Sequence, residues 1–128
     1  MLIRHEAERL KPYADQFGNL TIGVGRNLAD RGISHDEAMI LLTNDINLCI
    51  AQATHQFGWF EGLSDRRQMA VIDMIFNLGI TRFNQFSKTI AFIASGDFKS
   101  ASEEMLRSAW AQQVGDRATE LSQMILNG

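Results

Sequence analysis

The sequence predicts an α+β fold that is mostly helical and contains one small sheet. Residues 13–24 form two short alternating stretches around a glycine-containing turn, which is typical of a β-hairpin. From residue 35 to about residue 53, apolar side chains recur every three or four positions, which predicts one long helix. Further helical patterns follow residue 64, with glycines where helices are expected to end. A chain of 128 residues, 45% of them apolar, is long enough for a single globular domain.

The first candidate catalytic residue is Glu6. A short helical pattern runs from Leu2 to Leu10 and is expected to end at Pro12, which lacks a backbone donor and disfavours helical geometry in its predecessor. Glu6 would then lie near the C-terminal end of this helix. The partial negative charge of the helix carbonyls there disfavours ionisation of a carboxyl group, so Glu6 is a candidate general acid.

The predicted hairpin carries two further polar candidates. Asp15 is expected to end the first strand, and Thr21 to enter the second. Between them, Gly18 and Asn19 are expected to supply the left-handed backbone conformations of the turn. Alternation along residues 20–24 sends the apolar side chains to one face, and Thr21 and the glycines to the other. A polar face without bulky side chains suits a large substrate such as a sugar chain.

Two carboxyl groups that face a cleft are the catalytic groups of most glycoside hydrolases. The motif H-E-x-x-R-L-x-x-Y-x-D followed by G-x-L-T-I-G-x-G resembles the active-site segment of phage-type lysozymes, the endolysins that cut peptidoglycan. The resemblance implies that Glu6 donates a proton, that Asp15 orients an attacking water, and that Thr21 helps to hold this water. It also implies an inverting reaction at the β-1,4 bond between N-acetylmuramic acid and N-acetylglucosamine, and a role in bacterial cell lysis.

The resemblance extends over nearly the whole chain and implies four substrate-binding residues, namely Asn27, Phe76, Thr89 and Arg117. Their own patterns also permit structural roles, with Phe76 in the core and Arg117 as a surface charge. Three positions depart from the best-known members: Arg26 replaces a histidine, Asn27 replaces an apolar residue, and Glu104 replaces an amide. Subsite preferences therefore stay open.

The resemblance further implies a single lysozyme-like domain over residues 1–128. A small hairpin lobe would cover about 1–34, a linking helix about 35–54 and a helical lobe about 55–128, with the substrate cleft between the lobes. Ser34 and Glu37 match a capping box at the start of the linking helix. Further helices are predicted over 65–78, 81–85, 87–95, 97–109 and 116–126. The helix over 65–78 has almost no polar face, so we expect it to be surrounded, with Asp73 as a buried exception.

Composition excludes several function classes. The net charge is −3, and residues 1–63 carry five basic against eight acidic side chains, so a basic stripe for nucleic acid is not expected. No apolar run is long enough to span a membrane. The single cysteine, Cys49, lies on the apolar stripe of a predicted helix, so we expect its side chain to be buried like that of a small hydrophobic residue. The three histidines lack metal-ligand spacing, so we expect no metal and no cofactor, and a monomeric enzyme whose partner is the peptidoglycan glycan strand.

Other interpretations of the sequence remain open. A lytic transglycosylase or a chitinase-like enzyme could use similar carboxyl groups, and a non-catalytic helical module could bind the cell wall or a partner protein. The first residues lack the charged and apolar regions of a signal peptide, so we expect the chain in the cytoplasm of the host. The family resemblance implies that it reaches the periplasm and cell wall through a holin-type route.

Overall fold

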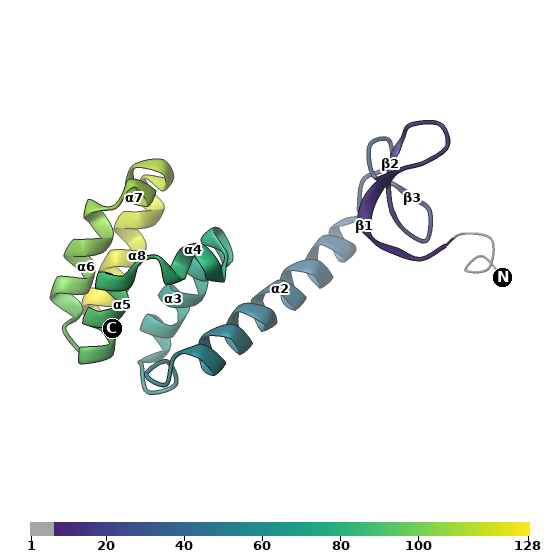
Figure 1. Ribbon diagram of the computed structural model, residues 1–128. Coiled ribbons are helices and arrows are strands. Elements are labelled where there is room, and N and C mark those ends of the chain that lie inside the picture. Colours follow the sequence, from purple (N-terminus) through teal and green to yellow (C-terminus); the bar gives the residue numbers. More distant parts are fainter. Residues whose placement is uncertain (1–6) are drawn as a thin grey trace. The chain divides into compact units, whose positions relative to one another are not determined.

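The computed structural model describes residues 7–128 (Figure 1). Contacts within the chain divide it into two compact units, Met1–Leu42 and Thr43–Gly128. The first unit contains a small sheet, and the second is helical. This content agrees with the predicted α+β class.

The sheet of the first unit has three antiparallel strands in the order β1-β2-β3. Their bounds are Arg9–Ala14 for β1, Leu20–Gly23 for β2 and Arg26–Asn27 for β3. Thr21 in the central strand pairs with Tyr13 on one side and Asn27 on the other. The sequence predicted the hairpin of β1 and β2. It did not predict β3, because a strand of two residues is too short to show an alternating pattern.

Pro12 does not end a helix here, so that part of the prediction is wrong. Arg9 and Leu10, which were expected at the end of the first helix, lie in strand β1 together with Pro12. The strand tolerates the proline because β1 is at the edge of the sheet, where an amide facing away from the ladder needs no partner. The register is irregular between Arg9 and Tyr13, around the proline. Residues 1–6, which include most of the predicted helix, lie outside the described part of the chain.

The turn of the hairpin uses one left-handed residue where two were predicted. Gly18 has φ of 81°, as expected, whereas no residue other than glycine has a positive φ in the described part of the chain. Asn19 therefore keeps an ordinary conformation. The faces of β2 also differ from the expectation: Thr21 is its buried residue, and Leu20 is half exposed. Thr21 is also the residue of β2 that pairs with both neighbouring strands, with Tyr13 and with Asn27.

Helix α2 spans His35–Gln56 and contains the predicted linking helix. It begins with the predicted capping box, since Glu37 N donates to Ser34 Oγ at 3.1 Å and Ser34 N donates to Glu37 Oε1 at 2.9 Å. Only Cys49 and Ala53 of its apolar stripe are buried. Burial raises the pKa of the Cys49 thiol, in agreement with a packed side chain and not a reactive thiolate.

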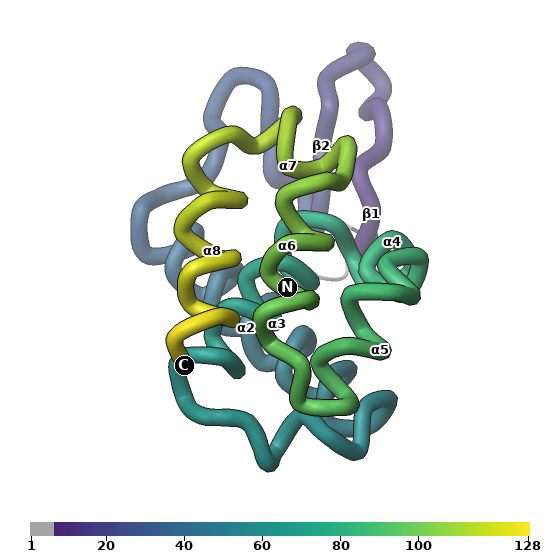
Figure 2. Tube along the Cα trace, turned by 90° about the vertical axis from the view of Figure 1, so that its left-hand side faces the viewer, coloured from purple at the N-terminus to yellow at the C-terminus, as the bar shows by residue number. Residues whose placement is uncertain are grey.

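The second unit is built from six helices after α2. Their bounds are Asp65–Leu78 for α3, Ile80–Asn84 for α4, Ser87–Ser95 for α5, Phe98–Arg107 for α6, Ala109–Val114 for α7 and Asp116–Asn127 for α8. Helix α8 packs against α3, α6 and α7, and α5 packs against α6 (Figure 2). Helix ends follow local signals: the Ser64 hydroxyl accepts from Arg67 N at the start of α3, and Gly96 closes α5 in the left-handed conformation.

The helix predicted over residues 97–109 is α6, which ends at Arg107, and the short helix α7 that follows it was not predicted. Asp97 is the N-cap residue of α6, and its carboxylate accepts a hydrogen bond from Ser100 N at 3.1 Å. Ser108 then leaves the helical conformation, with ψ of 155°, and its hydroxyl accepts from Ala111 N at 3.2 Å to start α7. A serine that can cap a new helix therefore competes with continuation of the old one.

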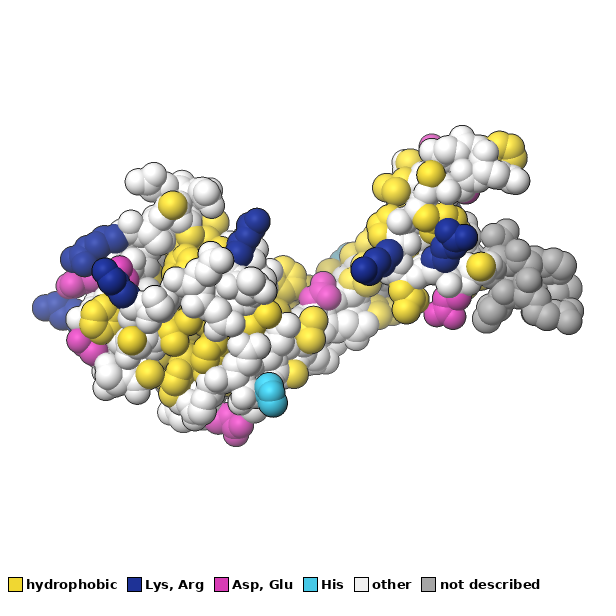
Figure 3. Space-filling view, in the orientation of Figure 1, with side chains coloured by type: hydrophobic (Ala, Val, Ile, Leu, Met, Phe, Trp, Pro, Cys, Tyr) yellow, Lys and Arg dark blue, Asp and Glu magenta, His cyan; other side chains and the backbone are white. Residues whose placement is uncertain are grey.

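All the buried apolar side chains in the described part of the chain belong to the second unit. Phe83, Met74, Ile75 and Met105 are among the largest of them. Helix α3 is less enclosed than predicted, because Met69 and Phe76 are exposed while the opposite face is buried. Hydrophobic side chains also reach the surface in both units (Figure 3). No helix in residues 7–128 combines the length and hydropathy needed to cross a membrane.

Candidate active site

Asp15 lies directly after β1 and organises the turn of the hairpin. Its Oδ1 accepts hydrogen bonds from the backbone N–H groups of Phe17 and Asn19, each at 2.9 Å. The backbone closes the same turn, because Asp15 N donates to Asn19 O and Gly18 N donates to Asp15 O. Within residues 7–128, Oδ2 of Asp15 has no hydrogen-bond partner. One carboxylate oxygen therefore fixes the side chain, and the other is left for a ligand or a water.

Thr21 is held next to the same turn. It is 3% exposed, and its hydroxyl donates to Asn19 O at 2.8 Å. Asp15 thus accepts a hydrogen bond from the backbone N–H of Asn19, and Thr21 donates one to the backbone C=O of the same residue. The donated proton leaves the lone pairs of the Thr21 oxygen as acceptors. The structure therefore brings Asp15 and Thr21 together at one end of the hairpin.

Strand β2 leaves open space at Gly23, two residues beyond Thr21. This residue has φ of 69°, and a Cβ atom added to it would meet no heavy atom within 4 Å. A side chain there would be strained by the backbone and would fill the open space. Of the open polar face predicted for this strand, the structure shows open space at Gly23, whereas Thr21 is buried. Glu6, the predicted proton donor, lies outside the described residues.

Arg26 and Glu37 form an ion pair that was not predicted. Arg26 Nη1 donates to Glu37 Oε1 at 2.8 Å and Nη2 donates to Oε2 at 2.7 Å, while Nη1 also reaches Gly32 O at 3.1 Å. The hydrogen bonds from Arg26 and from the backbone of Ser34 lower the pKa of Glu37 from 4.5 to about 2. The pair ties β3 to the start of α2. Its members are eleven residues apart, so no helical or strand spacing could reveal it.

Asn27 is the predicted substrate-binding residue of the first unit. It ends β3, and its side chain bonds to the next turn, with Oδ1 accepting from Asp30 N at 3.0 Å and Nδ2 donating to Asp30 Oδ2 at 3.1 Å. The adjacent ion pair of Arg26 holds the same strand. Asn27 is therefore fixed in position by local polar contacts.

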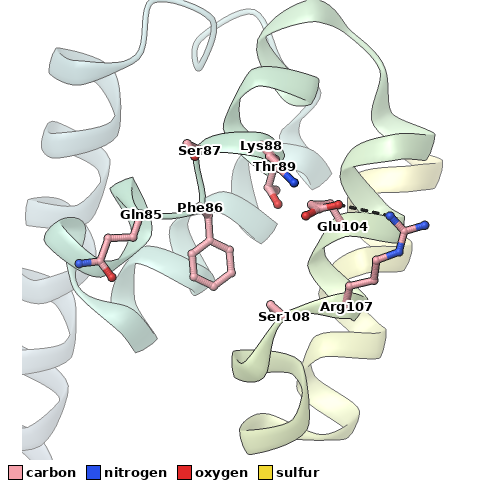
Figure 4. A pocket seen from close by; sticks show the side chains of 8 residues that line it. All are labelled: Gln85, Phe86, Ser87, Lys88, Thr89, Glu104, Arg107 and Ser108. Atoms are coloured by element: carbon pink, nitrogen blue, oxygen red, sulfur yellow. Dashed lines mark hydrogen bonds and ion pairs between the residues drawn. The ribbon is translucent and has the colours of Figure 1, made fainter.

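Thr89, predicted to bind substrate, lines a pocket that lies within the second unit. The pocket has a volume of about 340 Å³ and is formed by the segment that leads into α5 and by the end of α6. Figure 4 shows Thr89 and Glu104 pointing toward each other from these two helices, with the ring of Phe86 directed into the same space. Edge contact with Trp110, with ring centroids 6.1 Å apart, supports the Phe86 ring. In the sequence, Glu104 stood out only because it departs from the family pattern. The basic residue three positions later, Arg107, is the signal that could have indicated its ion pair on the helix surface.

Phe76 and Arg117, the other predicted substrate contacts, lie outside this pocket. Phe76 is 42% exposed on α3, so its structural interpretation as a core residue is wrong. Arg117 on α8 forms an ion pair with Asp73 on α3, with Nε donating to Oδ1 at 2.7 Å. Asp73 is half exposed and not buried as predicted, because the long guanidinium group reaches it at the surface.

No group of three or more His, Cys, Asp or Glu side chains within residues 7–128 is arranged to hold a metal ion. On the face shown in Figure 3, the basic and acidic side chains of the helical unit are interspersed. The groups that the structure presents are thus a carboxylate with a neighbouring hydroxyl on the hairpin, and a mixed-charge pocket on the helices.

Comparison with known proteins agrees with these features. The family model for phage lysozyme matches residues 3–123. The chain is 26% identical to probable T4-type lysozyme 1 of Dictyostelium discoideum, over all of this chain and 92% of that protein. It is 29% identical to an endolysin of Acyrthosiphon pisum secondary endosymbiont phage 1, over 91% of this chain and 80% of that protein.

A third relative shows the same region within a longer protein. The chain is 27% identical to the pre-baseplate central spike protein Gp5 of Enterobacteria phage T4, over all of this chain and 27% of that protein. The match of the family model covers the hairpin with Asp15 and Thr21 as well as the helices. The chain therefore belongs to the phage lysozyme family and is a glycoside hydrolase of peptidoglycan.

Proposed function

We propose that this enzyme hydrolyses the β-1,4 bond between N-acetylmuramic acid and N-acetylglucosamine with inversion of configuration, and that it serves bacterial cell lysis. Glu6 is the proton donor, Asp15 is the base that orients the attacking water, and Thr21 helps to hold this water. The observation that carries the proposal is the arrangement around Asn19, which fixes Asp15 and Thr21 side by side and leaves Asp15 Oδ2 unpaired within residues 7–128.

The reaction balances as a single displacement. Glu6 gives its proton to the glycosidic oxygen, and the bond from this oxygen to C1 of the sugar breaks. A water bound by Asp15 and Thr21 attacks C1 from the opposite face and transfers a proton to Asp15. The product is the anomer of opposite configuration. Open space at Gly23, two residues beyond Thr21 on β2, supports the proposal, since a sugar ring needs a part of the strand without side chains.

Substrate binding is proposed for Asn27 in the first unit and for Phe76, Thr89 and Arg117 in the second. Their local settings support this role in different ways. Asn27 is hydrogen-bonded to Asp30, Phe76 offers an exposed aromatic ring that can stack on a sugar, and Thr89 lines a pocket. Arg117 is proposed to act with Asp73, its ion-pair partner.

The test is the Glu6→Gln variant, measured by release of new reducing ends from purified cell wall. Because a general acid contributes about 10²–10⁴ in rate, activity should fall by about this factor while circular dichroism remains unchanged. Glu8→Gln is the matched control, as Glu8 is exposed two residues away and has no assigned role. Retained activity in Glu6→Gln would remove Glu6 from the mechanism.

The products distinguish the other enzyme classes. The anomer released first from a glycan oligomer, followed by NMR, should be α; a β anomer would contradict inversion. Anhydro-muramic ends, lighter by one water in mass spectrometry, would identify a lytic transglycosylase, and cleavage of chitin oligomers in preference to wall would identify a chitinase-like enzyme. Saturable wall binding without new ends would identify a binding module.

We also propose that the protein accumulates in the host cytoplasm and reaches the wall through a holin-type route. The proposal rests on the family to which the chain belongs. It is tested by following lysis of cells that express the protein with and without a co-expressed holin. Lysis that starts only when the holin is present would support the route, and equal lysis without it would contradict it.

A further inference from the structure

The turn of the hairpin presents an aromatic side chain to solvent. Phe17 is 78% exposed, more than any other aromatic side chain of residues 7–128. Within the same residues, its ring neither stacks on another aromatic ring nor carries a cation over its face. A phenylalanine this exposed contributes little to packing, since the stabilisation by an apolar side chain grows with the area it buries. The ring is therefore available to a ligand.

The same turn holds Phe17 close to Asp15. Phe17 N donates to Asp15 Oδ1 at 2.9 Å, and the next amide, Gly18 N, donates to Asp15 O at 2.9 Å. These two hydrogen bonds fix the backbone of Phe17 relative to the carboxylate. Because the two residues are two positions apart, their Cα atoms are at most about 7 Å from each other. A glycan strand that is bound at Asp15 therefore passes within reach of the Phe17 ring.

The surface of the turn is open and, apart from Asp15, uncharged. Gly18 has φ of 81°, and a Cβ atom added to it would meet no heavy atom within 4 Å. Asp15 carries the only charged side chain from residue 12 to residue 25. Gln16 is exposed in the same turn, and its amide can both donate and accept hydrogen bonds. An aromatic ring beside an amide on an uncharged surface suits a ligand that has both hydroxyl groups and an apolar face, as a sugar has.

We infer that the Phe17 ring stacks on the C–H face of an N-acetylhexosamine ring of the glycan strand, next to the bond that is cleaved. The carbon-bound hydrogens of a β-linked pyranose ring form an apolar face, and the negative face of an aromatic ring attracts them. This inference rests on the proposed function, because it takes Asp15 as the group beside which the strand reacts. Phe17 then determines specificity, and it binds the ground state and the transition state alike, so it acts mainly on KM.

The kinetic test separates the aromatic ring from its apolar bulk. Phe17→Leu keeps an apolar side chain without a ring face, and it should lower kcat/KM on purified wall about fivefold, mainly through KM, as for an aromatic contact in the middle of its range. Phe17→Tyr keeps the ring and should restore most of the activity. Leu10→Ala is the control, because Leu10 is 81% exposed on β1 and has no assigned role. Full activity in Phe17→Leu, with an unchanged unfolding midpoint, would overturn the inference.

A binding test distinguishes failure of this inference from failure of the proposed reaction. The probe is a tetrasaccharide of alternating N-acetylglucosamine and N-acetylmuramic acid without stem peptides, added to Asp15→Asn protein, in which Oδ1 still accepts the turn hydrogen bonds. Sugar protons that stack on the Phe17 ring should shift upfield in NMR, and these shifts should disappear when Phe17→Leu is added. Such shifts would support the contact even if the wall were not hydrolysed. Their absence, or their persistence in the double variant, would overturn it and leave the reaction unaffected.

Discussion

The two units of this enzyme are stabilised by different interactions. In the described part of the first unit, Thr21 is the single buried side chain, and the fold is held by turn hydrogen bonds, strand pairing and the Arg26–Glu37 ion pair. The second unit buries all the core apolar side chains of residues 7–128. Asp15 and Thr21 therefore belong to the unit that is held by polar contacts, and the apolar core belongs to the other unit. Substitutions in the two units should accordingly have separable effects on activity and on stability.

The largest expected effect on stability is that of Phe83→Ala in the second unit. Phe83 is fully buried and contacts the edge of Phe57, with ring centroids 5.6 Å apart. Its truncation should lower the free energy of unfolding by about 3–5 kcal/mol. Phe17→Ala in the hairpin turn is the control, because Phe17 is 78% exposed, and it should change stability by about 0.5 kcal/mol or less. Similar losses in chemical denaturation for both would contradict the comparison.

Asp15→Asn tests the first unit through activity. Asparagine keeps an Oδ1 that accepts from Phe17 N and Asn19 N, so the turn should persist while the carboxylate charge is lost. We expect a loss of about 100-fold in wall hydrolysis with an unchanged unfolding midpoint. Asp36→Asn, in the exposed first turn of α2, should retain activity. If Asp15→Asn were fully active, Asp15 would be a turn residue only.

Arg67→Met tests polar stabilisation within the helical unit. Arg67 donates to Ile125 O at 2.7 Å and to Leu126 O at 3.1 Å, and its guanidinium lies 3.5 Å from the centroid of the Phe98 ring. Loss of these contacts should cost about 1–2 kcal/mol in denaturant unfolding. The neighbouring Arg66→Met, at an exposed position, should cost less than about 0.5 kcal/mol. Equal effects would show that α3 does not anchor the end of α8 through Arg67.

The smallest effect concerns pH and the Arg26–Glu37 pair. Because the folded pKa of Glu37 lies below its ordinary value, the pair stabilises the protein above pH 4.5, and this contribution is lost as the pH falls toward about 2. Arg26→Gln should therefore destabilise β3 near neutral pH and have little effect near pH 2, as measured by thermal loss of the Asn27 and Leu28 amide signals. Arg31→Gln, at an exposed position, is the control. A destabilisation independent of pH would mean that Arg26 acts through packing.

Local signals in the sequence determined much of this molecule. The turn at Gly18, the capping box at Ser34, the cap at Ser64 and the stop at Gly96 were each predicted and are each present. All depend on contacts within about four residues, which a sequence pattern records directly. The resemblance carried by residues 5–25 predicted the family, which the comparison across residues 3–123 shows.

Tertiary structure alone decided the features that join distant residues. Pro12 lies in a strand because β1 is at the sheet edge, and Arg26 pairs with Glu37 across eleven positions. Arg117 reaches Asp73 from another helix. The pocket around Thr89 exists because the start of α5 and the end of α6 meet, which no periodicity in either segment specifies. Such contacts depend on packing of whole elements, so the sequence named candidate residues and the fold determined which of them face one another.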